Sequence, residues 1–205
     1  MRFLDDDARA AFKRAIEAIE NASAVEVVVA VRRRSADYHH ANAIAGAFIA
    51  LAGLAAMLYS SATFSVSSIL VDPFVVGMAA AALVELTPQV KRLLTPAARR
   101  RRDVTRAARA TFVERGVHAT TGRSGVLVYI SWLERQVALV ADIGLARALP
   151  ADALARAEAE LTRAMPRGGV EVARRLETLA GELSRAMPHR ADDVNELPDA
   201  IDGDA

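Results

Sequence analysis

Residues 41–86 form an apolar stretch that has arginines on both sides and none in its middle. Residues 41–59 carry no charge, and at about 1.5 Å per residue they are long enough to cross a hydrocarbon core of about 30 Å. Residues 64–86 form a second such run, in which only Asp72 and Glu85 are charged. The pattern predicts a hairpin of two transmembrane helices within residues 41–94, at about 41–60 and from 64 or 73 to 90.

The second helix has two possible starting points. If it begins at Phe64, Asp72 lies inside the membrane, where a carboxylate is costly. Asp72 followed by Pro73 is also typical of a helix start, with aspartate as the cap and proline in the first turn. We expect the continuous helix to start near Pro73, after an apolar re-entrant or interfacial connection at residues 60–71.

Basic residues lie at both ends of the predicted hairpin and are absent from its turn, residues 60–63. Because positively charged flanks stay in the cytoplasm, we expect a protein of the cell inner membrane. Both termini should lie in the cytoplasm, with only the turn on the far face. The expected partner of these cations is an anionic lipid surface, at about 1 kcal/mol for each basic residue near it. The flanking cations are Arg32, Arg33, Arg34, Lys91, Arg92, Arg99, Arg100, Arg101 and Arg102.

Composition narrows the classes of function. A net charge of +1, from 26 basic and 25 acidic residues, argues against a general nucleic-acid binder. The absence of cysteine excludes disulfides, thiolate catalysis and zinc sites of the cysteine type.

The sequence outside the hairpin predicts an α/β domain in two parts, residues 1–35 and 97–188. Residues 5–20 have helical spacing, and residues 25–31 form a strand so rich in valine that only Glu26 interrupts it. This is the pattern of a strand covered on both faces. Its expected sheet partners, residues 125–132 and 136–141, come after the hairpin, so the hairpin is predicted to be an insertion within a single domain.

The remaining chain is predicted to be mostly helical. Residues 97–115, 152–165 and 170–187 show helical spacing, and residues 116–125 read as a polar connection. Residues 189–205 lose apolar periodicity and fill with aspartate and glutamate, which predicts a disordered acidic tail.

Three segments, residues 25–29, 122–131 and 134–145, resemble the TPM domain family. In that family a strand of the type EIVVVV leads on to GVLLYVS and RRVxVVADRGI, and one bacterial branch carries a transmembrane pair after the first strand. The resemblance covers about residues 5–185. It implies an α/β/α sandwich, here interrupted by the hairpin. Among family members it also implies acid phosphatase activity, calcium or magnesium binding, or membrane-associated assembly. The sequence departs from the family at Ile143 and at residues 145–148.

Two groups of residues are candidates for a site, and no catalytic constellation is visible. Glu26 lies within an apolar strand and Asp142 ends one, and two carboxylates meeting at one sheet end could hold calcium or magnesium. Arg123 and Ser124 lie in a glycine-flanked loop whose amides and guanidinium could bind an anion. The structural alternatives are charge pairing and a turn for the carboxylates, and an ordinary connection for the loop.

Three functions from different classes remain open. The first is a membrane-anchored TPM-like module that is not catalytic and binds or assembles an unidentified protein partner at the cytoplasmic face. The second is a divalent-metal-dependent phosphatase. The third is a small oligomeric transporter or channel subunit, packed through the small residues Gly46, Ala50, Gly53, Ala56, Gly77 and Ala81.

Overall fold

The computed structural model describes residues 3–189, 196–197 and 201–203. The chain divides into two compact units. The first unit contains Met1–Ala36 and Arg101–Ala205, and the second contains Asp37–Arg100. The first unit is a mixed α/β structure and the second is helical, so the chain leaves the α/β unit and returns to it after the helices.

A four-stranded mixed sheet with the order β3-β2-β1-β4 lies at the centre of the first unit. Its strands are β1 (Val27–Arg32), β2 (Val126–Ser131), β3 (Gln136–Ala141) and β4 (Ile201–Gly203). β1 pairs in parallel with β2 and with β4, whereas β2 and β3 form an antiparallel hairpin. The prediction that strands following the apolar stretch extend the sheet begun before it is therefore confirmed.

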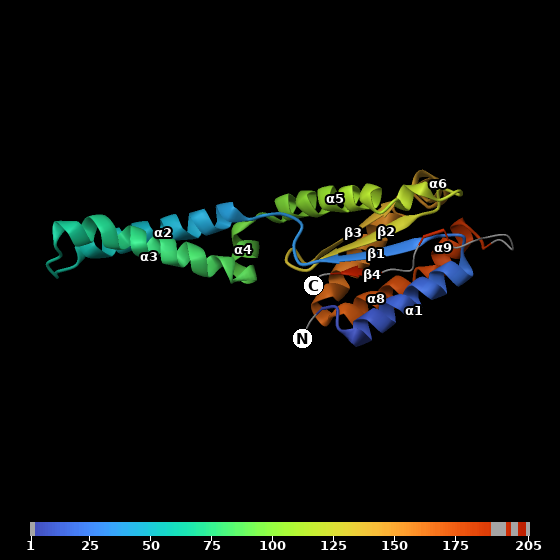
Figure 1. Ribbon diagram of the computed structural model, residues 1–205, viewed down its shortest axis with the longest axis horizontal. Coiled ribbons are helices and arrows are strands. Elements are labelled where there is room, and N and C mark those ends of the chain that lie inside the picture. The colour runs from blue at the N-terminus through green and yellow to red at the C-terminus, as the bar shows by residue number, and fades with distance from the viewer. Residues whose placement is uncertain (1–2, 190–195, 198–200, 204–205) are drawn as a thin grey trace. The chain divides into compact units, whose positions relative to one another are not determined.

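Helices cover both faces of this sheet (Figure 1). Val27, Val29 and Val31 pack into the core beneath α1 (Asp6–Ala22), α7 (Ala153–Ala164), α8 (Gly169–Glu177) and α9 (Ala180–Ala186). Val28 and Ala30 pack into a second core beneath α5 (Ala97–Glu114). Successive side chains of β1 thus enter opposite cores, which explains why the strand is apolar throughout.

Helix boundaries follow local signals where such signals exist. Asp5 caps α1 by accepting a hydrogen bond from the Ala8 amide at 2.9 Å, and Phe12, Ile16 and Ile19 lie on its buried face. The single helix predicted for residues 170–187 is instead α8 and α9, with Thr178 at the end of the first. Short helices that were not predicted include α6 (Ile143–Ala148) and the 3-10 turns η1 (Val117–Ala119) and η2 (Met165–Arg167). The second apolar helix, expected to reach residue 90, ends at Glu85, and a separate short helix follows at Pro88–Leu94.

The second unit contains α2 (His39–Tyr59), α3 (Val66–Glu85) and α4 (Pro88–Leu94). Among the described residues, α2 and α3 are the two helices long and apolar enough to cross a membrane. They pack together through glycines, because a Cβ at Gly77 would lie 2.7 Å from the Gly46 carbonyl oxygen. The small residues therefore bring the two helices of one hairpin together.

The expected start of the second apolar helix near Pro73 is wrong, because α3 begins at Val66 and contains Pro73. The Ser65 hydroxyl caps the helix by accepting a hydrogen bond from the Ser68 amide at 3.1 Å. Proline removes one hydrogen bond from the helix ladder but does not end the helix here. At about 1.5 Å per residue, the 20 residues of α3 match the hydrocarbon thickness of about 30 Å.

The end of α3 is held by a polar group within the second unit. The Lys91 ammonium is 3% exposed and lies 2.7 Å from a Glu85 carboxylate oxygen, which also accepts a hydrogen bond from the Asn42 side chain at 2.7 Å. The apolar side chains of the same helices point outward, with Phe48 70% exposed and Phe74 65% exposed. Exposed apolar surface of this extent marks a site of contact with a membrane or with another protein.

The prediction of a disordered acidic tail at residues 189–205 is wrong for residues 201–203, which form β4. Main-chain pairing with β1 and charge pairing of Asp202 hold this short strand in place. The parts of the predicted tail at residues 190–195, 198–200 and 204–205 lie outside the described residues.

Candidate functional site

Glu26 and Asp142 come to the same end of the sheet, where β1 and β2 begin and β3 ends. Val126, the first residue of β2, pairs with Val27 on one side and with Ala141 on the other. Glu26 directly precedes Val27 and Asp142 directly follows Ala141. Their backbones are separated by β2, so they stand about 9 to 10 Å apart, which is two strand spacings.

Both carboxylates have partners within the fold. Glu26 accepts hydrogen bonds from the amides of Glu196 and Leu197 at 3.2 and 3.3 Å. Asp142 caps α6 through the Ile143 amide at 2.7 Å. Its second oxygen is buried and lies 3.3 Å from the Arg123 guanidinium, but it accepts no hydrogen bond from the described residues. Within the described ranges no group of three or more His, Cys, Asp or Glu residues could hold a metal ion. The metal site stays a prediction.

The loop of Arg123 and Ser124 is tightly packed. Arg123 has a left-handed backbone, with φ of 52°, and donates a hydrogen bond to the His118 carbonyl at 2.8 Å. Ser124 is buried, and its amide donates to the Thr120 hydroxyl at 3.0 Å. A Cβ at Gly144 would lie 2.6 Å from the Arg123 carbonyl, so α6 closes against this loop. The Arg123 guanidinium faces Asp142, and the anion site stays a prediction.

A buried polar cluster lies at the opposite end of the sheet, where β1 and β2 end. The Glu134 carboxylate accepts hydrogen bonds from the Ser35 amide at 2.9 Å and from the Ser131 hydroxyl. The Ser35 hydroxyl donates to Ser131 at 2.7 Å and contacts the Tyr129 hydroxyl at 3.3 Å. The sequence gives one signal for this cluster, a glutamate in the short turn between two apolar strands.

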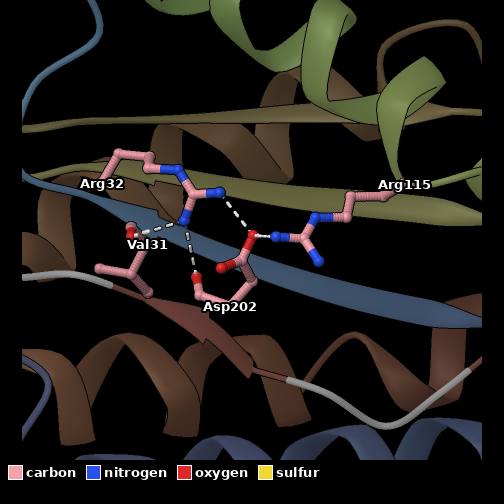
Figure 2. A network of polar contacts seen from close by, with 4 residues as sticks. All are labelled: Val31, Arg32, Arg115 and Asp202. Atoms are coloured by element: carbon pink, nitrogen blue, oxygen red, sulfur yellow. Dashed lines mark hydrogen bonds and ion pairs between the residues drawn. The ribbon is translucent and has the colours of Figure 1, made fainter.

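Two arginines meet one carboxylate at the β4 edge of the sheet (Figure 2). Asp202 forms ion pairs with Arg32, the last residue of β1, and with Arg115, directly after α5. Arg32 also donates to the Asp202 carbonyl at 3.2 Å. The hydrogen bond from Arg32 and the charges of both arginines hold the pKa of the Asp202 carboxyl below its ordinary value of 3.8.

Further contacts attach the described residues of the acidic segment, residues 196–197 and 201–203, to the α/β unit. The Glu196 carboxylate accepts hydrogen bonds from the Thr121 amide at 3.0 Å and from the Thr121 hydroxyl at 3.1 Å. Leu197 packs against the core beneath α5, and Ile201 packs against the core on the other face. The described residues of this segment are therefore attached by charge, main-chain and apolar contacts together.

A cavity of about 330 Å³ opens beside the turn between β2 and β3. Trp132 and Arg135 line it together with Gly168 and Gly169. Asp5, the carboxylate in its lining, already caps α1. The cavity thus has a cationic and aromatic character, and it lacks a paired acid and base that would perform chemistry.

The predicted flanking cations fall into three groups. Arg32 and Lys91 are engaged inside the protein, by Asp202 and Glu85. Five others are exposed to solvent, of which Arg101 also lies 3.9 Å from Glu158: Arg33, Arg34, Arg99, Arg101 and Arg102. Arg92 and Arg100 are half-buried.

Comparison with known proteins defines the molecule only at the level of its fold, a mixed α/β protein with a four-stranded mixed sheet. No family model matches the sequence, and no curated protein matches it. The fold is similar to the NMR structure of BA42 protein from the psychrophilic bacterium Bizionia argentinensis, with a TM-score of 0.59 and 14% identity. The similarity covers 99% of this chain and 97% of that chain.

Proposed function

We propose that this protein is a membrane-anchored binding module whose α/β unit is a TPM-like domain held at the cytoplasmic face of a membrane. α2 and α3 cross the bilayer as a hairpin, and the α/β unit binds a protein partner without catalysing a reaction. The observation that carries the proposal is the exposure of large apolar side chains along both helices, in a unit inserted between β1 and β2 of one sheet.

Three features support a membrane as the cover of these side chains. Each helix is about 30 Å long at about 1.5 Å per residue, which matches a hydrocarbon core. The connection between them, residues 60–65, contains no charged residue. Exposed arginines at positions 33, 34, 99, 101 and 102 lie outside the two helices in the sequence, where anionic headgroups attract them.

A binding role agrees with the polar groups of the α/β unit. The carboxylates of Glu26, Asp142 and Glu134 are all engaged in hydrogen bonds or ion pairs, so they stabilise the fold. The resemblance to TPM domains with a transmembrane pair favours a module that assembles with another protein at the membrane.

Extraction of membranes with alkaline carbonate tests the anchor. The full chain should stay in the pellet, as should the control Ala62→Asp, which changes the connection between the helices. Phe48→Asp combined with Phe74→Asp should move the protein to the supernatant, because a charge at the centre of a transmembrane helix costs about 2.5 to 3.5 kcal/mol. Release of the unchanged chain by carbonate would contradict the proposal.

A further inference from the structure

The two edges of the sheet are closed in different ways. At the β3 edge, side chains of α7 bind the strand: the Thr162 hydroxyl accepts from the Val137 amide at 3.1 Å, and Glu158 accepts from the Leu139 amide at 2.8 Å. At the β1 edge, the cover is β4, three residues of the acidic segment. An open strand edge is a template for pairing with another chain.

We propose that the β1 edge is a docking site for an extended segment of a protein partner with the pattern apolar, acidic, glycine, and that Ile201, Asp202 and Gly203 occupy this site until such a segment displaces them. The inference deepens the proposed function, on which it rests, by naming the surface that binds the partner.

The resident strand defines the pattern, because alternate side chains of a strand point to opposite faces. Ile201 packs against the core on the α1 side. Asp202 points to the other face, where Arg32 and Arg115 converge on its carboxylate (Figure 2). A Cβ at Gly203 would lie 2.3 Å from the end of the Leu4 side chain, so a larger residue fits there only if Leu4 moves. Main-chain pairing supplies affinity and these three positions supply specificity, as in other cases of strand addition.

The resident strand is short. Its described residues pair with Val29, Ala30 and Val31, three of the six residues of β1, and are half-buried. The Val27 amide is bound instead by the Glu20 carboxylate, at 3.1 Å. A partner strand long enough to pair with all six residues of β1 competes with this three-residue strand for the edge.

A labelled synthetic peptide with the sequence of residues 196–205 tests the site on the purified full chain in detergent. Asp202→Ala in the chain removes the carboxylate that holds β4 and frees the edge. This variant should bind the peptide at least about tenfold more tightly than the unchanged chain, which is the scale of one charge-assisted hydrogen bond. Glu177→Ala, which removes an exposed carboxylate of α8, is the matched control and should bind like the unchanged chain.

Three further arms establish that the bound peptide lies at the β1 edge. Gly203→Val in the chain crowds the Leu4 side chain and weakens the attachment of β4, so it should change peptide binding in the same direction. Arg115→Gln added to Asp202→Ala, or Asp202→Asn in the peptide, should weaken binding about tenfold.

Equal peptide binding by the Asp202→Ala chain and the unchanged chain would overturn the proposal. Peptide binding that does not change when the peptide carries Asp202→Asn would also overturn it. Light scattering that shows Asp202→Ala chains paired through exchanged segments would also overturn it, because the occupant would then be a second copy. These measurements in detergent do not depend on membrane topology, so the inference and the proposed anchor can fail separately.

Discussion

Glu134 is 2% exposed and lies in a buried cluster of hydrogen bonds. Its carboxylate accepts hydrogen bonds from the Ser35 amide and the Ser131 hydroxyl, and Ser131 in turn accepts from the Ser35 hydroxyl. Ser35 lies one residue before the end of the first part of the α/β unit. The cluster therefore fixes the point at which the chain leaves the sheet for the apolar helices.

Replacing Glu134 by glutamine tests this role. The amide has the shape of the carboxylate but carries no charge, so the charge-assisted hydrogen bonds from the Ser35 amide and the Ser131 hydroxyl become weaker. We expect Glu134→Gln to lower the free energy of unfolding by about 1 to 3 kcal/mol. Glu160→Gln, which changes an exposed carboxylate of α7, should leave it unchanged. Denaturant unfolding of both variants in detergent makes the comparison, and equal stability would show that Glu134 does not fix the chain.

Asp202 makes the attachment of β4 dependent on pH. Arg32 and Arg115 lower the pKa of this carboxyl below 3.8 in the folded protein. The attachment is therefore at full strength above the pKa of the unfolded chain and is lost as pH falls through the lower folded pKa. The difference in stability between the unchanged chain and Asp202→Asn should be constant near neutral pH and shrink below about pH 4. A difference that grew on acidification would contradict the assigned ion pairs.

At the scale of elements, Gly77 and Gly53 make different contacts between α2 and α3. A Cβ at Gly77 would lie 2.7 Å from the Gly46 carbonyl and 2.8 Å from the Ala50 Cβ, whereas a Cβ at Gly53 would meet only the Pro73 Cα, at 4.0 Å. The two positions therefore differ in whether they tolerate one added methyl group.

Alanine at each position gives opposite results under this arrangement. Gly77→Ala should force the helices apart and destabilise the hairpin by about 1 to 3 kcal/mol. Gly53→Ala should be neutral or stabilising, because alanine is favoured over glycine in a helix by up to about 1 kcal/mol. Thermal unfolding in detergent, followed by circular dichroism, compares them. If both variants melt together, the glycine contact does not hold the hairpin.

Sequence patterns predicted the elements that local chemistry determines. The valine-rich β1, the hairpin of β2 and β3, and α5 follow from apolar periodicity and turn residues. The start of α3 was missed because Asp72 and Pro73 resemble a helix start as much as Ser65 does, and the structure uses the serine. β4 was missed because an acidic segment has no intrinsic strand preference and forms a strand only by pairing with β1.

The same distinction explains the candidate sites. The sequence placed Glu26 and Asp142 at one sheet edge, and the register of β1, β2 and β3 agrees with that placement. It could not show that amides and Arg123 engage their oxygens. Arg115 and Asp202 are 87 residues apart in the sequence, and Arg32 and Asp202 are 170 residues apart. Only the tertiary structure reveals such contacts.

At the scale of the whole molecule, the apolar helices are an insertion. β1 precedes them and its parallel neighbour β2 follows them, so the sheet cannot form until the chain has passed through both helices. If the helices cross a membrane, both connections to the α/β unit lie on one face of it. In the proposed arrangement, the α/β unit and the connection at residues 60–65 lie on opposite sides of the bilayer.

Cysteine accessibility measures this arrangement directly, because the chain contains no cysteine of its own. Ala62→Cys marks the connection between α2 and α3, and Glu177→Cys marks the exposed side of α8. In intact spheroplasts a membrane-impermeant maleimide should label position 62 and leave position 177 unlabelled until the membrane is permeabilised. Labelling of both positions from the same side, or of position 177 alone, would contradict the central claim that the hairpin holds the α/β unit at the cytoplasmic face.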